Sequence, residues 1–334
     1  MTTVGTRTGG SRRTAWRLVD SYALPAAYLI LIVVYSALRP HTFATIQNWR
    51  AIFGGQAVRA VAALALVVPL VGGRFDLSVG STIGITSVIT ASSMSRFGLA
   101  LVPSMIIAMI AGAIIGTVTG FLVARLGINS LVATLGVSTL LDGIVQWYTN
   151  GIPISAGLSR TLLLVSGNRF LGIPELFFFM LVFALAIWYL LTQTPYGRRL
   201  ASVGSNAEAA RLVGLRVEAT VWVSFIIAGT VAGCAGVMSV AQQGSANPAV
   251  GGIPFLLPAL AAVFLGSTTI QPGRYNVPGT LLALYFVGTN VSGLALLGEG
   301  PWVQPVFVGS AVVVAVALST FARRRRTGIA DLGA

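Results

Sequence analysis

The sequence predicts an all-α fold, a polytopic membrane bundle of about ten transmembrane helices with both termini in the cytoplasm. Of the 334 residues, 55% are hydrophobic and 9% are charged, whereas soluble domains carry about 25% charged residues. Apolar runs of membrane-spanning length alternate with short segments that hold most of the arginines. The arginines are also distributed unequally between alternate segments, as the positive-inside rule predicts for a membrane protein.

Ten segments are apolar and long enough to cross a bilayer, which needs about 20 residues with some latitude. In chain order they span approximately 24–38, 57–72, 77–94, 99–124, 130–149, 171–191, 217–241, 253–267, 277–297 and 302–321. Charges, prolines and glycines mark their ends. The second and eighth segments are short and bounded by glycine, which predicts tilted or broken helices that lie against protein rather than lipid.

With the N-terminus inside, ten crossings place fifteen of the 21 arginines in the cytoplasm. The six outside, or at the outer interface, are Arg39, Arg50, Arg59, Arg96, Arg160 and Arg169. Nine or eleven crossings would leave one arginine-rich end outside, against the positive-inside rule. No small-x-small cleavage site follows Leu38, so the first helix is predicted to stay uncleaved. Around the transmembrane domain, 21–322, we expect a disordered cytoplasmic tail at 1–20 and a basic cytoplasmic tail at 323–334.

The side-chain inventory excludes several functions. All 21 basic residues are arginine, so the chain lacks the lysine of a phosphate-binding P-loop and of a Schiff-base enzyme. Cys234 and His41 are the only residues of their types, which excludes an intrachain disulfide and leaves too few ligands for a zinc site. The net charge of +13 is spread between apolar segments, so the predicted partner is the lipid bilayer and not nucleic acid. We expect no catalytic residue, metal site or bound cofactor in this chain.

Glycines recur at every fourth position in two predicted helices. Gly112, Gly116 and Gly120 lie in the fourth segment, and the seventh contains Gly229 and Gly233. Such stripes give one smooth helix face and predict close packing between helices. An interface that moves during transport is the alternative interpretation.

The longest polar stretch, 192–216, is predicted to be a cytoplasmic loop that contains a short amphipathic helix. Asn206 is placed to cap this helix, Glu208 lies in its first turn, and Gly214 is placed to end it. Its few apolar positions suit either a groove on a partner protein or the membrane surface. The pattern does not separate these two interpretations.

Two parts of the sequence resemble the ABC importer permeases. In the loop, Glu208-Ala209-Ala210 stands in the place of their EAA element. The run GRFDLSVG at 73–80 resembles the G-x-x-D-L-S-V-G signature of monosaccharide permeases of the ribose-transport type. TPYGR at 194–198, followed by VGSN at 203–206 and AAR at 209–211, matches their second landmark. The similarity covers most of 24–321, and its departures, at 74–75 and at 271–277, bear on the substrate more than on the family.

The resemblance implies the permease subunit of an ATP-driven monosaccharide importer in a bacterial plasma membrane. It implies three partners: a second permease copy or paralogue, a pair of cytoplasmic ABC ATPase subunits that hold ATP and magnesium, and an extracytoplasmic sugar-binding protein. The residues implied to couple to the ATPase are Asn206, Glu208, Ala209, Ala210, Arg211 and Gly214. The signature residues, with an implied role at a gate, are Asp76, Leu77, Ser78 and Gly80.

Asp76 comes directly before a predicted helix start, where its carboxylate can satisfy unpaired N–H groups as an N-cap. This structural role is favoured over a direct role in transport. A broken, capped helix would suit a gate, and Arg74 is placed to pair with Asp76 across the turn.

Asp142 is the only acidic residue well inside a predicted span, and Gln146 and Thr149 follow it on the same helix face. Intramembrane polar groups usually face a bundle interior or a cavity, and the neighbouring Trp147 offers a ring face to sugar C–H bonds. These residues, with Asn290 of the ninth segment, are the candidates for the translocation path. Interhelical hydrogen bonds that hold the helices in place are the alternative interpretation.

Other functions compete with a sugar importer. An ion-coupled secondary transporter would use Asp142 as its carboxylate, but it leaves the helix at 206–214 without a role. An ABC permease for branched-chain amino acids or nucleosides shares the general fold, and the DLSVG run favours sugar. A non-transporting scaffold predicts no polar residues within helices, which Asp142, Gln146 and Asn290 contradict. The identity of the sugar and the choice between homodimer and heterodimer stay open.

Overall fold

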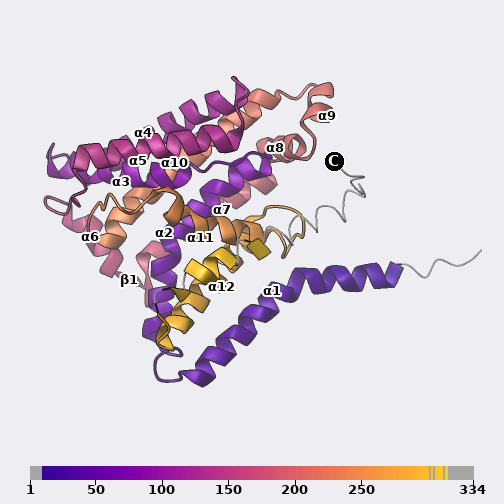
Figure 1. Ribbon diagram of the computed structural model, residues 1–334, viewed down its shortest axis with the longest axis horizontal. Coiled ribbons are helices and arrows are strands. Elements are labelled where there is room, and N and C mark those ends of the chain that lie inside the picture. The colour runs from indigo at the N-terminus through magenta and orange to yellow at the C-terminus, as the bar shows by residue number, and fades with distance from the viewer. Residues whose placement is uncertain (1–9, 301, 304, 311–312, 315–334) are drawn as a thin grey trace, which may run out of the picture.

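The computed structural model describes residues 10–300, 302–303, 305–310 and 313–314, and over these the chain is a bundle of helices with one small hairpin (Figure 1). Its elements in chain order are α1 (Gly10–Leu38), α2 (Ile46–Val71), α3 (Val79–Ser95), α4 (Leu101–Ala124), α5 (Ser130–Thr149), α6 (Arg160–Gly167), β1 (Arg169–Phe170), β2 (Ile173–Pro174), α7 (Glu175–Gln193), α8 (Pro195–Ser205), α9 (Ala207–Leu212), α10 (Val217–Gln243), α11 (Gly252–Gly266) and α12 (Val277–Leu296).

Nine of the ten predicted segments coincide with helices of the described chain, and the tenth, 302–321, falls mostly outside the described residues. Six of the described helices are long and apolar enough to cross a membrane, namely α2, α4, α5, α7, α10 and α12. The apolar part of α1, Tyr22–Leu38, and α11 are shorter. Exposed large apolar side chains lie on α1, α4, α5 and α7, as expected of helices that face lipid.

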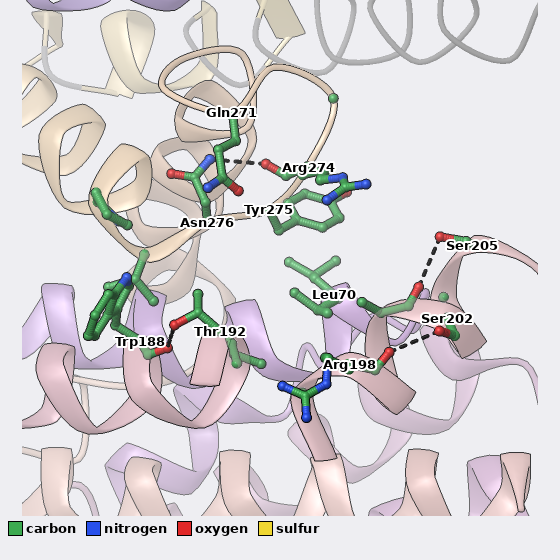
Figure 2. A pocket seen from close by; sticks show the side chains of 18 residues that line it. Leu70, Trp188, Thr192, Arg198, Ser202, Ser205, Gln271, Arg274, Tyr275 and Asn276 are labelled. Carbon is green, nitrogen blue, oxygen red and sulfur yellow. Dashed lines mark hydrogen bonds between the residues drawn. The ribbon is translucent and has the colours of Figure 1, made fainter. Parts of the chain in front are cut away.

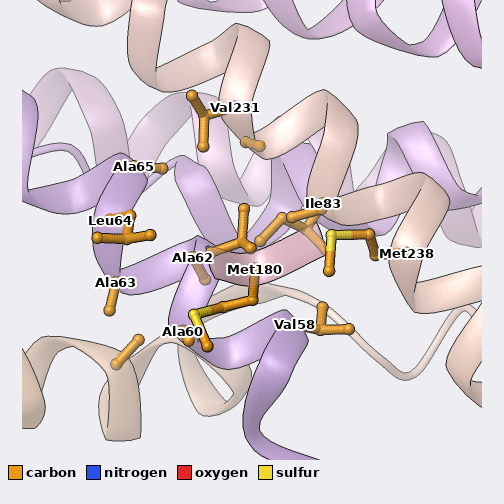
Figure 3. Packing of buried hydrophobic residues seen from close by; sticks show 14 of the residues in the cluster. Val58, Ala60, Ala62, Ala63, Leu64, Ala65, Ile83, Met180, Val231 and Met238 are labelled. Carbon is orange, nitrogen blue, oxygen red and sulfur yellow. The ribbon is translucent and has the colours of Figure 1, made fainter. Parts of the chain in front are cut away.

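Helix α2 forms the centre of the bundle. Every side chain from Ala57 to Leu70 except Arg59 is buried, and these side chains pack among those of α3, α7 and α10, including Ile83 and Met180 (Figure 3). Small alanines alternate here with larger residues, so neighbouring helices can approach α2 on several sides.

The predicted second segment, 57–72, is wrong in length, because α2 begins at Ile46 and has 26 residues. Gly54 does not break the helix. Because Gly54 has no side chain, the ring of Pro174 in β2 can pack beside it, 3.2 Å from where a Cβ of residue 54 would lie. As a further correction, Arg59 lies in the middle of α2 rather than at the outer interface. The eighth segment is short as predicted, since α11 has 15 residues.

Helices α4 and α10 are in backbone contact, as their glycines predict. A Cβ on Gly112 would overlap the carbonyl oxygen of Gly229, and a Cβ on Gly233 would lie 2.7 Å from the carbonyl oxygen of Ala108. Neither approach leaves room for a side chain, so the glycines are required by packing. This contact confirms the close packing that the glycine stripes predict.

Helix α1 runs along the edge of the bundle beside α12 (Figure 1). It begins at Gly10, so the expectation of a disordered tail over 1–20 is wrong for 10–20, while 1–9 lie outside the described residues. No glycine or proline occurs between Ser11 and Leu24, so nothing in that stretch stops the helix from extending. The predicted C-terminal tail, 323–334, also lies outside the described residues.

A hairpin precedes α7. Strands β1 and β2 pair in antiparallel register across a turn at Leu171 and Gly172, which both have positive φ. The Arg50 Nε–H of α2 donates to the Gly172 carbonyl oxygen at 2.7 Å. The sixth predicted segment, 171–191, therefore starts too early, because its first residues form this turn and α7 begins only at Glu175.

Candidate functional site

The signature forms the buried linker between α2 and α3. Asp76 is 2% exposed, and its Oδ1 accepts hydrogen bonds from the Ser78 N–H at 3.1 Å and the Ser78 hydroxyl at 2.5 Å. Ser78, not Asp76, is the N-cap position of α3, so the carboxylate satisfies a donor at the helix start without occupying the cap. In the described part of the chain Asp76 forms no ion pair with Arg74. That predicted pair is wrong, since the carboxylate turns back onto Ser78.

Gly80 and Gly84 of α3 let the start of α11 approach closely. A Cβ on Gly80 would overlap the Gly252 carbonyl oxygen, and a Cβ on Gly84 would lie 3.3 Å from the Val250 carbonyl oxygen. Gly252 itself has φ +63, a conformation that favours glycine. The signature therefore joins the α2–α3 linker to the α10–α11 linker, two segments far apart in the sequence.

Helices α8 and α9 form the loop between α7 and α10. Thr194 caps α8 by accepting a hydrogen bond from the Gly197 N–H at 3.2 Å. Asn206 ends α8 and caps α9, because its Oδ1 accepts from the Ala209 N–H at 3.0 Å. Gly214, with φ +84, follows the end of α9. The short helix and its cap are confirmed as predicted from the sequence, whereas α8 was not predicted.

Helix α9 has a buried face and an exposed face. Ala210 packs with Val203 and neighbouring apolar side chains, whereas Leu212 and Val213 are 89% and 76% exposed. Arg211 forms a salt bridge with Glu218 of α10 at 2.5 Å, both side chains being solvent-exposed. The candidate coupling residues that are exposed are Asn206, Glu208, Ala209, Arg211 and Gly214.

Helix α8 is anchored to the bundle. The Tyr196 hydroxyl donates to the Thr220 carbonyl oxygen of α10 at 3.1 Å. Burial raises the pKa of the Tyr196 phenol above its usual value, so the hydroxyl stays protonated and remains a donor. Gly204 lies against the Val71 carbonyl oxygen at the end of α2, closer than a side chain would allow. The loop therefore rests directly on the helix that leads into the signature.

The polar stripe of α5 faces the α10–α11 linker. Asp142 is half-buried, and its Oδ2 lies 2.8 Å from the position of a Cβ built on Gly252. A carboxylate at the start of α11 suits the positive end of the helix dipole. The Gln146 Nε2–H donates to the Pro248 carbonyl oxygen of the same linker at 3.3 Å. Thr149, in contrast, is buried and donates to a carbonyl of its own helix.

The outer face of α5 is open. Trp147 is 79% exposed and lines a shallow depression of about 710 Å³ together with Gly136 and Gly143. No atom lies within 4 Å of a Cβ built on either glycine. Tyr148 differs from Trp147, because the Arg96 guanidinium lies 4.5 Å from its ring centroid. Trp147 is therefore the aromatic residue of the stripe that is free to contact another molecule.

Asn290 of α12 lies away from the α5 stripe. Its Oδ1 accepts a hydrogen bond from the Tyr35 hydroxyl of α1 at 2.7 Å. Two turns of α1 earlier, the hydroxyls of Tyr28 and Thr289 are 2.9 Å apart. These bonds hold α1 against α12, which favours the interhelical interpretation for Asn290.

Two polar residues near the α10–α11 linker were not predicted. Arg59 is half-buried, its Nε has no hydrogen-bond partner among the described residues, and its guanidinium lies 6.0 Å from the Phe255 ring centroid of α11. The Gln242 Nε2–H of α10 donates to the Gly54 carbonyl oxygen at 2.7 Å. The predicted second segment begins only two residues before Arg59, so the sequence placed Arg59 at the outer interface, whereas α2 begins at Ile46.

The structure offers little to a metal ion. Among the described residues, no group of three His, Cys, Asp or Glu side chains is placed to hold one. The side chains that gather at the α10–α11 linker are instead amides, a carboxylate and a guanidinium, which can exchange hydrogen bonds with a polar solute.

Comparisons with known proteins point to one family of transport proteins. The family model described as branched-chain amino acid transport system / permease component matches residues 52–317. Ribose import permease protein RbsC of Escherichia coli (strain K12) is 34% identical over 317 residues, which cover 93% of this chain and 97% of that protein. RbsC of Bacillus subtilis (strain 168) is 32% identical, with 86% and 89% covered.

D-allose transport system permease protein AlsC of Escherichia coli (strain K12) is 28% identical, with 90% of this chain and 91% of that protein covered. No solved structure matches the chain. With its long apolar helices, the chain is a multi-pass protein of the bacterial inner membrane. It belongs to this family of membrane transport permeases, in the branch that contains the ribose import permeases.

Proposed function

We propose that this chain is the membrane-spanning permease subunit of an ATP-driven ABC importer for a monosaccharide. The similarity to ribose and allose permeases supports the solute class. In this proposal the chain crosses the membrane ten times with both termini in the cytoplasm. A separate pair of ATPase subunits binds ATP and magnesium, an extracytoplasmic binding protein delivers the sugar, and a second permease copy or paralogue completes the path.

The observation that carries the proposal is the exposed apolar tip of the α8–α9 loop. Leu212 and Val213 are almost fully exposed beside a helix whose other face is buried. An amphipathic helix of this kind can place its apolar residues in a groove of a partner protein. The lipid surface is the competing location, and an assay of ATP coupling separates the two.

Contacts within the bundle supply a route from this loop to the membrane interior. A displacement of α9 would move α8, whose Gly204 rests on the end of α2 at Val71. The signature linker follows directly and reaches the start of α11 through Gly80. Closure of the ATPase pair would thus shift the α10–α11 linker, a hinge-like transition that opens the path alternately to each side.

The translocation path is proposed to run along α5. Asp142 and Gln146 contact the α10–α11 linker there, and Trp147 is exposed on the adjacent face. Arg59 and Gln242 lie beside the same linker and add donors that suit sugar hydroxyl groups. Amide, carboxylate and ring faces together are typical of weak contacts to a carbohydrate.

The test is uptake of radiolabelled sugar by proteoliposomes that contain the chain with its ATPase and binding protein. We expect uptake to require ATP and all three components, and to be lost when Leu212→Ser and Val213→Ser are combined. Leu171→Ser is the matched control, because Leu171 is 83% exposed in the hairpin at the other end of the bundle (Figure 1). Uptake by the chain alone, driven by an ion gradient and lost in Asp142→Asn, would instead identify a secondary carrier.

A further inference from the structure

A pocket of about 500 Å³ lies beside α8 of the coupling loop (Figure 2). Its floor is the end of α2, at Leu70. One wall is formed by the end of α7 and by α8, and the opposite wall is the linker between α11 and α12, from Gln271 to Asn276. Glycine and alanine face the pocket along α8 and keep it open. The α5 stripe contributes nothing to it.

The polar lining of this pocket is positively charged. Arg198 of α8 and Arg274 of the linker project from opposite walls (Figure 2). Within the described residues neither guanidinium has an ion pair or a side-chain hydrogen bond, and no lining residue is acidic. The Gln271 amide adds a donor. Both arginines are solvent-exposed, and two cations without a counter-charge that line one pocket are suited to an anion.

The same pocket has an apolar side at the point where α7 ends. Trp188 and Leu191 line it there, on a helix apolar and long enough to span the membrane. Tryptophan near the end of a spanning helix is typical of the membrane interface. A ligand that fits both sides has an anionic head and an apolar body, and basic pockets between membrane helices bind lipid headgroups of this kind.

We propose that this pocket binds the phosphate of an anionic phospholipid, held between Arg198 and Arg274 with the glycerol against Trp188. The shared chemistry is a phosphate group, and the apolar wall favours a lipid over inorganic phosphate as its source. Because α8 forms one wall and continues into α9, a bound lipid would connect the coupling loop to the α11–α12 linker.

The test uses the full-length chain, purified, delipidated and titrated with phosphatidylglycerol or phosphatidylcholine while binding is followed by native mass spectrometry. We expect a preference for phosphatidylglycerol. Each of Arg198→Gln and Arg274→Gln should weaken that binding about five-fold, the effect of one basic residue near a lipid surface. Arg199→Gln is the matched control, since Arg199 is exposed on the same helix and does not line the pocket.

Several results would overturn the proposal. Equal loss in Arg199→Gln would indicate non-specific attraction of lipid to a basic surface. Unchanged binding in the double Arg198→Gln, Arg274→Gln variant would exclude the pocket, provided that the variant elutes as the wild type does in gel filtration. Displacement of the lipid by millimolar inorganic phosphate would identify soluble phosphate as the ligand. Loss of the preference when the ATPase subunits are bound would show that protein, not lipid, covers the pocket.

Discussion

Replacing Asn206 by alanine should uncouple ATP hydrolysis from uptake. Helix α9 has six residues, far fewer than an isolated helix needs to be stable in water. Its first turn depends on the 3.0 Å hydrogen bond from the Ala209 N–H to Asn206. Loss of an N-cap asparagine costs about 1 kcal/mol, which lowers the ratio of ordered to unwound α9 about five-fold. We expect sugar transported per ATP hydrolysed to fall by up to about that factor, measured in proteoliposomes with both quantities followed together.

Two further variants separate the cap from other roles. Asn206→Asp keeps an acceptor oxygen at the cap and should restore coupling. Ser205→Ala is the neighbouring control, because the Ser205 hydroxyl donates only to the Ala201 carbonyl oxygen within α8. Wild-type coupling in Asn206→Ala would refute the requirement for an ordered α9. Failure of Asn206→Asp equal to that of Asn206→Ala would mean that the amide itself contacts the ATPase.

Three other outcomes are expected. Gly80→Ala should lower the thermal unfolding midpoint and reduce uptake, since overpacking costs about 1–3 kcal/mol of stability. Gly55→Ala is the control and should leave both unchanged, because Gly55 has open space around it. Equal effects of the two substitutions would contradict the α3–α11 contact. Asp76→Asn keeps an acceptor oxygen and should transport normally. Asp76→Ala leaves a buried donor unpaired, which costs about 1–3 kcal/mol of folding free energy, so this variant should be less stable. If the two variants were indistinguishable in uptake and stability, the structural role of Asp76 would be wrong. Tyr35→Phe should lower stability by about 1 kcal/mol at unchanged transport, and a loss of uptake without a loss of stability would return Asn290 to the path.

The features that the sequence predicted correctly depend on local chemistry. An apolar run of sufficient length predicts a helix wherever it occurs, and nine of the predicted segments are helices in the structure. The cap at Asn206 and the end of α9 near Gly214 require only neighbouring residues. The glycine stripes of α4 and α10 could also be recognised, because glycines at a four-residue period predict close packing between helices.

The features that were missed depend on residues distant in sequence. Gly54 resembles a helix boundary until Pro174 is seen packed against it, and Arg59 was placed at the outer interface for the same reason. The partner of Gly80, at the start of α11, is more than a hundred residues away along the chain. No local pattern separates a glycine that ends a helix from one that admits another backbone.

Evolution has few ways to repair a substitution where α4 meets α10. At most packed positions a larger residue on one side can be offset by a smaller residue on the other. Gly112 and Gly229 each lie against the backbone of the other, and no amino acid is smaller than glycine. A change at either position can therefore persist only if a whole helix is displaced, so the pair should drift little and should show no compensating covariation.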